Sequence, residues 1–218
     1  MLQLEHVYFE PWKGPHYEDS GLWGRKVLVV SESHYDTWSD NPPAPETKHE
    51  LSRNFTNQCV QEVVDGAVGA RFWNGVRNRL GGAEHENQSS AVFWNKVACY
   101  CFIQSQVSGR AGTRPTAAQW AAAPAILREA LAILRPDRAV FFGDEVWWHV
   151  PPRDGKLTGI DVVGRRLPLP LEFFTLEDGK RVYVTQTAHP RSSKFIRALA
   201  RPLCEFVTRD HMANDEPG

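Results

Sequence analysis

Two short polar segments, far apart in the chain, carry residue types suited to catalysis. Residues 31–35 (Ser-Glu-Ser-His-Tyr) follow one apolar run, and residues 189–193 (His-Pro-Arg-Ser-Ser) follow another. In open parallel sheets, ligands bind where the carboxyl ends of the strands open onto one crevice. The two segments can therefore bring the carboxylate of Glu32 and the imidazole of His189 to one site. Such a pair can polarise a bond and stabilise a developing charge.

The elements that must position these segments form an alternating series of strands and helices. Apolar runs typical of strands covered on both faces occur at residues 27–30, 91–94, 139–143 and 182–185. Helical spacing and helix-end residues predict helices at residues 54–67, 72–80, 116–134 and about 193–209. This alternation predicts a three-layer α/β/α sandwich with a central, mostly parallel four-stranded sheet.

The clearest helix is expected to begin at Thr116, which forms a capping box with Gln119. Pro124 should kink or divide that helix, because proline removes a hydrogen-bond donor from its interior. Residues 151–180 should form a hairpin or a long excursion, and the proline-rich residues 40–45 a loop.

The length of 218 residues suits a single domain with its own core. We expect an irregular lead-in at residues 1–24, one domain at residues 25–209 and a flexible tail at residues 210–218. No apolar run approaches the roughly 18 residues of a membrane span, so no membrane association is expected.

Charge and cysteine content indicate which partners, cofactors and cell compartment to expect. The 25 basic and 26 acidic residues nearly balance, so average charge does not argue for nucleic-acid binding. The basic residues 191–209 are typical of either a local nucleic-acid patch or a solvated helix face. Four cysteines without C-x-x-C spacing and the absence of a signal sequence indicate a cytoplasmic protein with reduced thiols. The spacing predicts neither a metal site nor a cofactor.

The order of motifs resembles that of the uracil-DNA glycosylase superfamily. Residues 26–35 resemble its first motif, a strand running into G-Q-D-P-Y or, in the iron–sulfur branch, G-E-x-P-G. Residues 53–55 (Arg-Asn-Phe) resemble the R-P-F segment, and residues 93–97 (Phe-Trp-Asn-Lys-Val) the strand end that carries the base-reading Asn. Residues 114–143 resemble the R-x-P-T to V-x-x-L-G stretch of that branch, and residues 189–192 its H-P-S or H-P-A motif. The resemblance covers roughly residues 25–205.

The resemblance implies a monofunctional DNA glycosylase that hydrolyses the N-glycosidic bond of a flipped uracil or modified pyrimidine. Glu32 would stabilise the sugar cation or orient the attacking water, and His189 would donate a hydrogen bond to the base. Asn95 would read the pyrimidine edge, Phe55 would stack on the base, and Tyr35 would crowd its C5 position. Four of these residues also have a structural interpretation. Glu32 could be a loop carboxylate or helix cap, His189 a turn histidine, Asn95 a strand-ending Asn, and Phe55 a core aromatic.

The remaining candidates concern the first motif and the DNA backbone. His34 could be a second polar contact, a helper for Glu32, or a surface residue. The side chains expected to bind the DNA phosphates are those of Arg191, Ser192, Ser193, Lys194 and Arg197. DNA is the expected partner of an expected monomer. We expect Trp147, Trp148 and His149 to serve in core and surface aromatic packing and not in a site.

Departures from the family pattern leave the activity open. Ser33 stands where the best-known branch has its water-activating Asp, so that role is vacant or belongs to Glu32. Ser31 and His34 replace a Gly and a Pro. Cys99 aligns with one cluster cysteine, but the paired cysteines before the first motif are missing, so no iron–sulfur cluster is expected.

Three alternatives follow. The chain could excise bulky hypermodified bases in phage defence, or be a catalytically silent relative that binds DNA or protein. An unrelated α/β hydrolase or nucleotide-binding protein is disfavoured by the absence of G-x-S-x-G, P-loop and G-x-G-x-x-G motifs.

Overall fold

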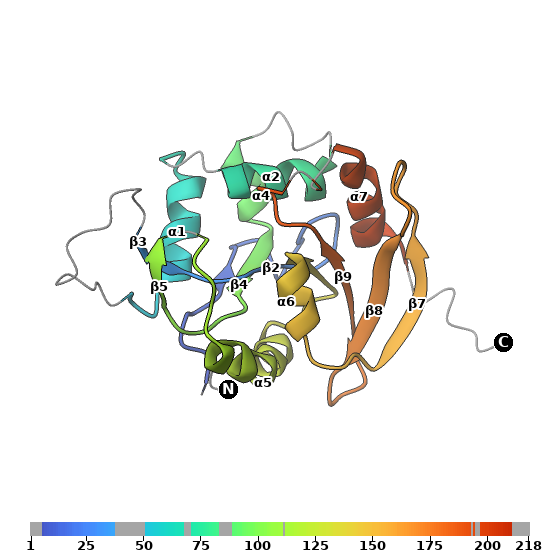
Figure 1. Ribbon diagram of the computed structural model, residues 1–218. Coiled ribbons are helices and arrows are strands. Elements are labelled where there is room, and N and C mark those ends of the chain that lie inside the picture. Colours follow the sequence, from blue (N-terminus) through green and yellow to red (C-terminus); the bar gives the residue numbers. More distant parts are fainter. Residues whose placement is uncertain are drawn as a thin grey trace.

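A mixed seven-stranded sheet runs through the centre of the computed structural model, which has an α/β fold (Figure 1). The structure describes residues 6–37, 51–67, 71–82, 89–110, 112–192, 194 and 197–210. In spatial order the strands are β1 (Trp12–Lys13), β4 (Val97–Cys101), β2 (Val27–Ser31), β6 (Arg138–Phe142), β9 (Arg181–Thr187), β8 (Leu169–Thr175) and β7 (Gly155–Ile160). A separate two-stranded sheet pairs β3 (Tyr35–Thr37) with β5 (Val107–Arg110).

The four central strands β4, β2, β6 and β9 are parallel, whereas β1, β8 and β7 add antiparallel edges. The expectation of a four-stranded sheet was therefore wrong in its extent. The expected hairpin at residues 151–180 is confirmed as β7 and β8, but it continues the main sheet. The segment at residues 1–24 was expected to be irregular, but part of it forms β1 and pairs with β4. Such edge strands alternate inward and outward residues, so they lack the continuous apolar run of a central strand.

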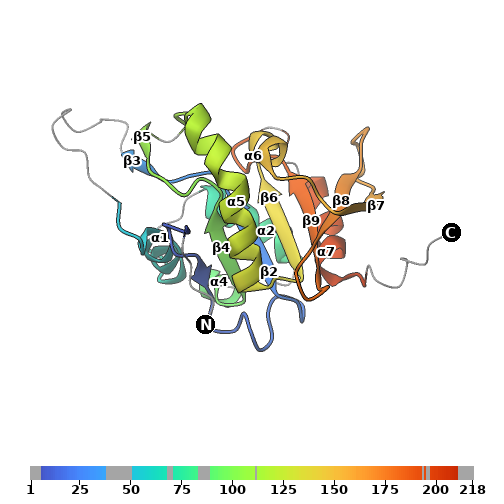
Figure 2. The same cartoon turned by 90° about the horizontal axis from the view of Figure 1, so that it is seen from below.

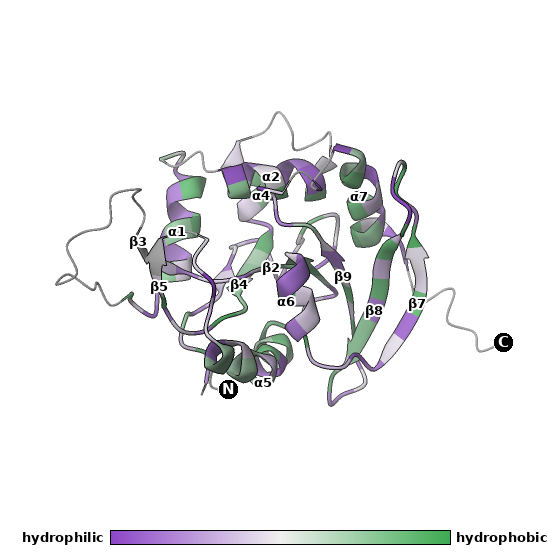
Figure 3. Cartoon of the chain, in the orientation of Figure 1, coloured by the Kyte–Doolittle hydropathy of each residue, from purple (hydrophilic) through white to green (hydrophobic). Residues whose placement is uncertain are grey.

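Helices cover both faces of the sheet (Figure 1). One layer holds α1 (Phe55–Val64), α2 (Arg71–Leu80), α4 (Ser90–Trp94) and α7 (Ala200–Thr208), and the other holds α5 (Ala117–Leu134) and α6 (Asp144–His149). Two hydrophobic clusters match these layers: Val27 and Val29 of β2 face the first, and Leu28 and Val30 face the second. Figure 3 shows the hydrophobic character of α5 and the alternation along β8.

Residues 91–94 form the end of α4 instead of the predicted strand, and the buried strand β4 follows them. A four-residue apolar run does not distinguish a buried strand from a short buried helix. The C-terminal helix also begins later than predicted, at Ala200, after a 3₁₀ turn at Arg197–Leu199. The predicted loop at residues 40–45 lies outside the described residues, as does the predicted tail at residues 210–218 apart from Asp210.

The predicted capping box is confirmed at the start of α5, where Thr116 and Gln119 cap each other. Pro124 does not divide α5, which runs unbroken to Leu134. Ala123 and Leu127, on either side of Pro124, are buried in the cluster beneath the helix, and this packing offsets the lost backbone hydrogen bond.

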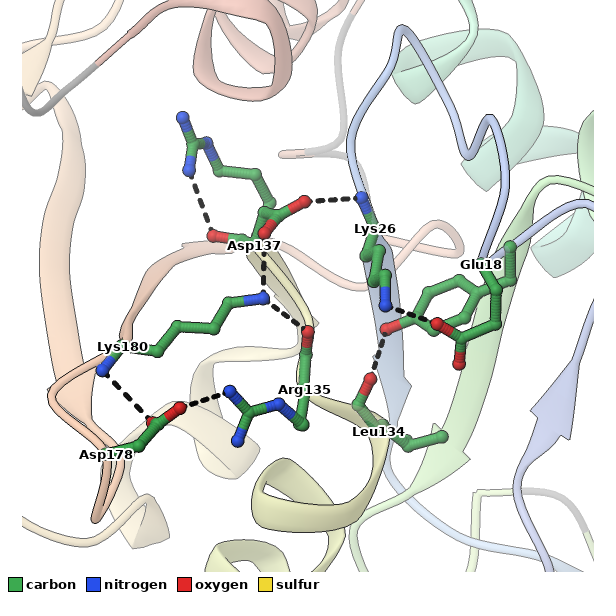
Figure 4. A network of polar contacts seen from close by, with 9 residues as sticks. Glu18, Lys26, Leu134, Arg135, Asp137, Asp178 and Lys180 are labelled. Atoms are coloured by element: carbon green, nitrogen blue, oxygen red, sulfur yellow. Dashed lines mark hydrogen bonds and ion pairs between the residues drawn. The ribbon is translucent and has the colours of Figure 1, made fainter.

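A network of polar contacts joins the amino ends of the central strands (Figure 4). Asp137, just before β6, accepts a hydrogen bond from the Lys26 backbone (2.8 Å) and pairs with Lys180 Nζ (2.9 Å). Lys180 also donates to the Arg135 carbonyl (2.7 Å), and Arg135 pairs with Asp178. The amino edge of the central strands is therefore stabilised by ion pairs and hydrogen bonds of charged side chains.

The strand order reverses between β2 and β6, because the chain moves from β2 out to β4 and then returns to the other side of β2. In open α/β sheets, the crevice at such a switch point, outside the carboxyl ends of the strands, is where ligands bind.

Within the described part of the chain, no helix is both long enough and apolar enough to cross a bilayer.

Candidate active site

A cavity of about 540 Å³ opens at the carboxyl edge of the central strands, at this switch point. Three segments line it: Ser31, which ends β2, with the next four residues to Tyr35; Gly143 to Glu145, which follow β6; and Ala188 and His189, which follow β9. In Figure 2 this edge carries α6 and lies opposite α4. The volume is in the range of small-molecule sites, and the residues singled out by sequence, Glu32 and His189, share its wall.

The backbone around Glu32 is held by hydrogen bonds to the segment that follows β4. The carbonyls of Ser31, Glu32 and His34 accept from the amides of Phe102 (2.9 Å), Ile103 (2.9 Å) and Val107 (3.0 Å). This pairing extends the parallel alignment of β2 and β4 beyond their ends. The Glu32 side chain therefore projects from a fixed backbone.

The carboxylate of Glu32 is largely buried and pairs with Arg114 Nη1 at 3.3 Å. The same guanidinium atom lies 2.6 Å from Glu145 Oε2, so Arg114 bridges two carboxylates at the cavity. Burial raises the pKa of Glu32, Arg114 opposes that rise, and the like charge of Glu145 adds to it. The protonation of Glu32 is thus controlled by its neighbours.

His189 is held as a neutral imidazole with a defined tautomer. Its Nδ1 accepts a hydrogen bond from the Arg191 amide (3.2 Å), which places the ring proton on Nε2. Burial, with the positive charges of Arg191 and Arg114, lowers the pKa of His189 to about 4. The ring lies 5.4 Å from that of Phe72. His189 therefore offers an N–H donor without carrying charge at neutral pH.

His34 is buried between the rings of Phe9 and Phe55, each 4.9 Å away in an edge-to-face arrangement. Its Nε2 lies 2.9 Å from Thr56 Oγ1, and burial lowers its pKa to about 4. Of the three roles left open for His34, the surface residue is excluded. Its ring packs the cavity wall against α1.

Tyr35 and Ser33 complete this side of the cavity. A hydrogen bond from Tyr35 favours the ionised form of Glu32, and burial raises the pKa of Tyr35 itself. The hydroxyl of Ser33 is buried and has no hydrogen-bond partner among the described residues. The Ser33 hydroxyl is therefore positioned to bind a polar group that enters the cavity, whereas the Tyr35 hydroxyl is engaged by Glu32.

Asn95 lies at the wrong edge of the sheet for the role implied by the resemblance. It caps α4 and precedes β4, and its carbonyl accepts from the His16 amide (2.8 Å). The five residues of β4 separate it from the cavity edge by roughly 16 Å at about 3.3 Å per residue. The expectation that Asn95 reads a base in this cavity is wrong, because the strand begins after Asn95 and not before it.

Phe55 does not line the cavity either. It begins α1 and packs against the hydrophobic cluster and the ring of His34, so it lies behind the wall. The rings that do line the cavity include Phe72 of α2 and Trp148 of α6. The side chain of Trp148 is 76% exposed at the cavity rim, so it lies at the surface, as one part of the prediction had it, but it also lines the candidate site.

The basic segment after β9 is only partly at the cavity. Arg191 and Ser192 line it, while the exposed Lys194 lies nearby, with Nζ 3.6 Å from Asp144 Oδ2. Arg197 is exposed on the 3₁₀ turn and does not line the cavity. Ser193 lies outside the described residues.

Sequence reasoning missed Asp144, Glu145 and Trp148 as cavity residues and quoted Arg114 without giving it a role. The signal for the first two was their place directly after a parallel strand, as for Glu32 and His189. Gly143 makes the sharp turn between β6 and α6 with φ +133°, and its amide donates to the Thr187 carbonyl (2.9 Å). Trp148 follows Asp144 by four residues and so shares its helix face.

Among the described residues, no group of three or more His, Cys, Asp or Glu side chains is arranged to hold a metal ion.

The comparisons with known proteins leave the family undecided. No protein-family model matches the chain, and no curated protein matches it either.

Proposed function

We propose that this protein is a monofunctional DNA glycosylase that hydrolyses the N-glycosidic bond of a flipped uracil or modified pyrimidine. The observation that carries the proposal is the shared cavity of the Glu32 carboxylate and the neutral His189 imidazole at the switch point of the sheet. Enzymes of this kind act on a base rotated out of the duplex into a pocket.

The two groups match the charges that develop in the reaction. As the C1′–N bond breaks, the sugar becomes cationic and the leaving base becomes anionic. Ionised Glu32 stabilises the cation and orients the water that forms the new C1′–O bond, while His189 Nε2–H donates to a base oxygen. The water releases one proton, and the departing base gains one from solvent. Interactions that strengthen only as charge develops accelerate the reaction.

Other cavity residues suit the binding of a base. Phe72 and Trp148 offer ring faces, and base stacking on an aromatic side chain contributes about 1–3 kcal/mol. With Asn95 at the opposite edge, the polar edge of the base would be read by the hydroxyl of Ser33. No lysine is among the described residues that line the cavity, which favours simple hydrolysis over a Schiff-base mechanism.

The test is a base-release assay on DNA containing uracil and on DNA containing hypermodified pyrimidines. Glu32→Gln should lower the rate on the order of 10²-fold or more, and His189→Ala on the order of 10²- to 10³-fold. Asn95→Ala is the matched control, because this side chain lies at the opposite edge and should leave the rate unchanged. Activity that survives both cavity substitutions would overturn the proposed site.

A catalytically silent DNA-binding relative is the second candidate. Two observations favour it: Ser33 occupies the position of the expected Asp, and the Glu32 carboxylate is engaged by Arg114. This candidate predicts no base release from any DNA but binding that weakens as salt is raised. The same assay, combined with binding measured at two salt concentrations, separates the two functions.

A further inference from the structure

One end of the cavity is formed by α6, which is anchored on the faces that turn away from the cavity. The ring of Trp147 lies against that of Phe141, with centroids 5.6 Å apart. The ring of His149 stacks on that of Trp120 of α5, 4.2 Å away. Trp148, between these two packed neighbours, is left exposed at the cavity rim. Its exposure therefore belongs to a fixed helix and not to a loose one.

The carboxylate of Asp144 lies one helical turn before Trp148 and has a fixed orientation. Gln186 Nε2 of β9 donates a hydrogen bond to Asp144 Oδ1 (2.6 Å). Asp144 Oδ2 has a looser ion pair, 3.6 Å long, with Nζ of the exposed Lys194. Because residues four apart share a helix face, the Asp144 carboxylate adjoins the ring of Trp148. The α6 end of the cavity thus combines an oriented acceptor with an aromatic surface.

The charged side chains that line the described cavity carry an excess of negative charge. The carboxylates are those of Glu32, Asp144 and Glu145, and the guanidinium groups are those of Arg114 and Arg191. Arg114 contacts both Glu32 (3.3 Å) and Glu145 (2.6 Å), so one positive charge is shared between two carboxylates. A cation that enters beside Asp144 therefore offsets charge that the protein itself leaves unbalanced.

A buried hydroxyl next to this end of the cavity also points to a ligand. Ser33 Oγ is buried and has no hydrogen-bond partner among the described residues. Val30 of β2 pairs with Phe141 of β6, and Ser33 and Asp144 each follow these paired residues by three positions. Both side chains line the cavity from neighbouring strand ends. Since buried polar groups are nearly always hydrogen-bonded, a polar part of the ligand is expected there.

The cavity has room for more than an unmodified nucleoside. At about 30 Å³ per water, a nucleoside displaces on the order of ten waters, or about 300 Å³. The cavity measures about 540 Å³. The ring of Phe72 lies 5.4 Å from that of His189 and so suits the base itself. The α6 end is therefore left for a substituent that the base carries.

We propose that the α6 end of the cavity, formed by Asp144, Glu145 and Trp148, is a subsite for a protonated amine carried by a modified pyrimidine. The ammonium lies over the Trp148 ring and donates a hydrogen bond to the Asp144 carboxylate. Cations bind to the face of a tryptophan ring, and charge-assisted hydrogen bonds are roughly twice as strong as neutral ones. This inference rests on the proposed function and narrows its substrates to pyrimidines with an alkylamine substituent.

The hydrogen-bonding groups at this subsite favour an amine over a hydroxyl. A hydroxyl both donates and accepts, whereas an ammonium only donates. The donors close to the subsite are already used, because Gln186 donates to Asp144 and Arg114 pairs with Glu145. What the carboxylates still offer is acceptor capacity, which matches an ammonium group.

The test measures base release from single-stranded oligonucleotides that carry uracil, uracil with an aminoethyl group at C5, or the N-acetyl derivative of that amine. Acetylation keeps the linker and removes the charge. For the wild type, kcat/KM should be at least about tenfold higher for the amine than for its acetylated form. Asp144→Asn and Trp148→Leu should each reduce this ratio to below about threefold. Asp144→Glu and Trp148→Phe should retain more of it.

A ratio of two rates on one protein cancels any general loss of activity that a substitution causes. Asp19→Asn is the matched control, because it removes an exposed carboxylate next to Glu18 of the amino-edge network. This variant should keep the ratio of the wild type. The preference for the amine should also shrink as salt is raised, since ions screen the attraction.

Equal rates for the amine and its acetylated form, or a ratio that Asp144→Asn leaves unchanged, would overturn the subsite. Release of uracil in the same assay would leave the glycosylase intact. A hydroxyethyl group at C5 that is released faster than the aminoethyl group would likewise overturn the preference for a cation.

A wild type that releases none of these bases would overturn the proposed function, and the subsite is then judged by equilibrium binding of the same oligonucleotides. Tighter binding of the amine that is lost in Asp144→Asn and kept in Asp19→Asn supports the subsite. Equal binding of the amine and its acetylated form overturns it.

Discussion

The chemistry of single residues in the cavity is decided by their neighbours. Burial alone would favour a protonated Glu32, which could not stabilise a cation, and Arg114 opposes that effect. The same charge adds to the burial of His189 in keeping its imidazole neutral. Arg114 is therefore a positioning residue that acts on the protonation states of both proposed catalytic groups.

Replacing Arg114 tests this interpretation through the pH dependence of base release. In Arg114→Gln, the pKa of Glu32 should rise further, because burial and the charge of Glu145 are then opposed only by the hydrogen bond from Tyr35. Activity that requires ionised Glu32 is lost as pH falls through this pKa, so the acidic limb should move to higher pH. The measurement is the rate of base release across pH 4–9.

Arg114→Lys is the matched control, since it keeps the charge, and its acidic limb should move less than that of the Gln variant. A uniform loss of rate with an unmoved limb would mean that Arg114 only supports the cavity wall.

At the scale of elements, the start of α5 shows how a local motif holds a long segment in place. Thr116 Oγ1 accepts from the Gln119 amide (3.3 Å), and Gln119 Oε1 accepts from the Thr116 amide (2.8 Å). Gln119 Nε2 also donates to the Ser105 hydroxyl and the Gln106 carbonyl, both at 2.9 Å. The hydrogen bonds of Gln119 thus connect the start of α5 to the segment between β4 and β5. Arg114 precedes this cap by two residues.

Thr116→Ala should lower the free energy of unfolding by about 1 kcal/mol, because one backbone donor of the first helical turn loses its acceptor. Thr116→Ser keeps the hydroxyl and should lose much less. Denaturant unfolding of both variants measures the difference. Equal destabilisation by Ala and Ser would show that the methyl group, and not the cap, supports this end of α5.

For the whole molecule, the two edges of the parallel sheet have different roles. The amino edge is closed by charged groups of several segments, whereas the carboxyl edge is left open for the cavity. Burial opposes ionisation of Asp137, but Lys180 and the Lys26 amide outweigh it and hold its pKa below the usual range. The ionised carboxylate therefore stabilises the fold.

Asp137→Asn should destabilise the protein by on the order of 1–2 kcal/mol at neutral pH, since charged hydrogen bonds are replaced by weaker ones. Because the pKa of Asp137 is depressed in the folded state, its contribution is present above the unfolded value, 3.8, and is lost as pH falls below it. The difference between variant and wild type in denaturant unfolding should shrink at low pH. A difference that does not change with pH would contradict an ionic role.

The sequence by itself determined three of the four central strands and the loops at their ends. The strands at residues 27–30, 139–143 and 182–185 and the capping box at Thr116 were predicted because apolar runs and caps are local patterns. Glu32 and His189 were placed at strand ends for the same reason. These features depend on neighbours within a few residues in the chain.

Only the tertiary structure decided which residues share an edge of the sheet. A shift of the second core strand from residues 91–94 to Val97–Cys101 carries Asn95 from the carboxyl edge to the amino edge. The partners of Arg114, the burial of His34 and the place of the β7–β8 hairpin depend on strand order and register. Those are set by contacts between segments far apart in sequence, which no local pattern encodes.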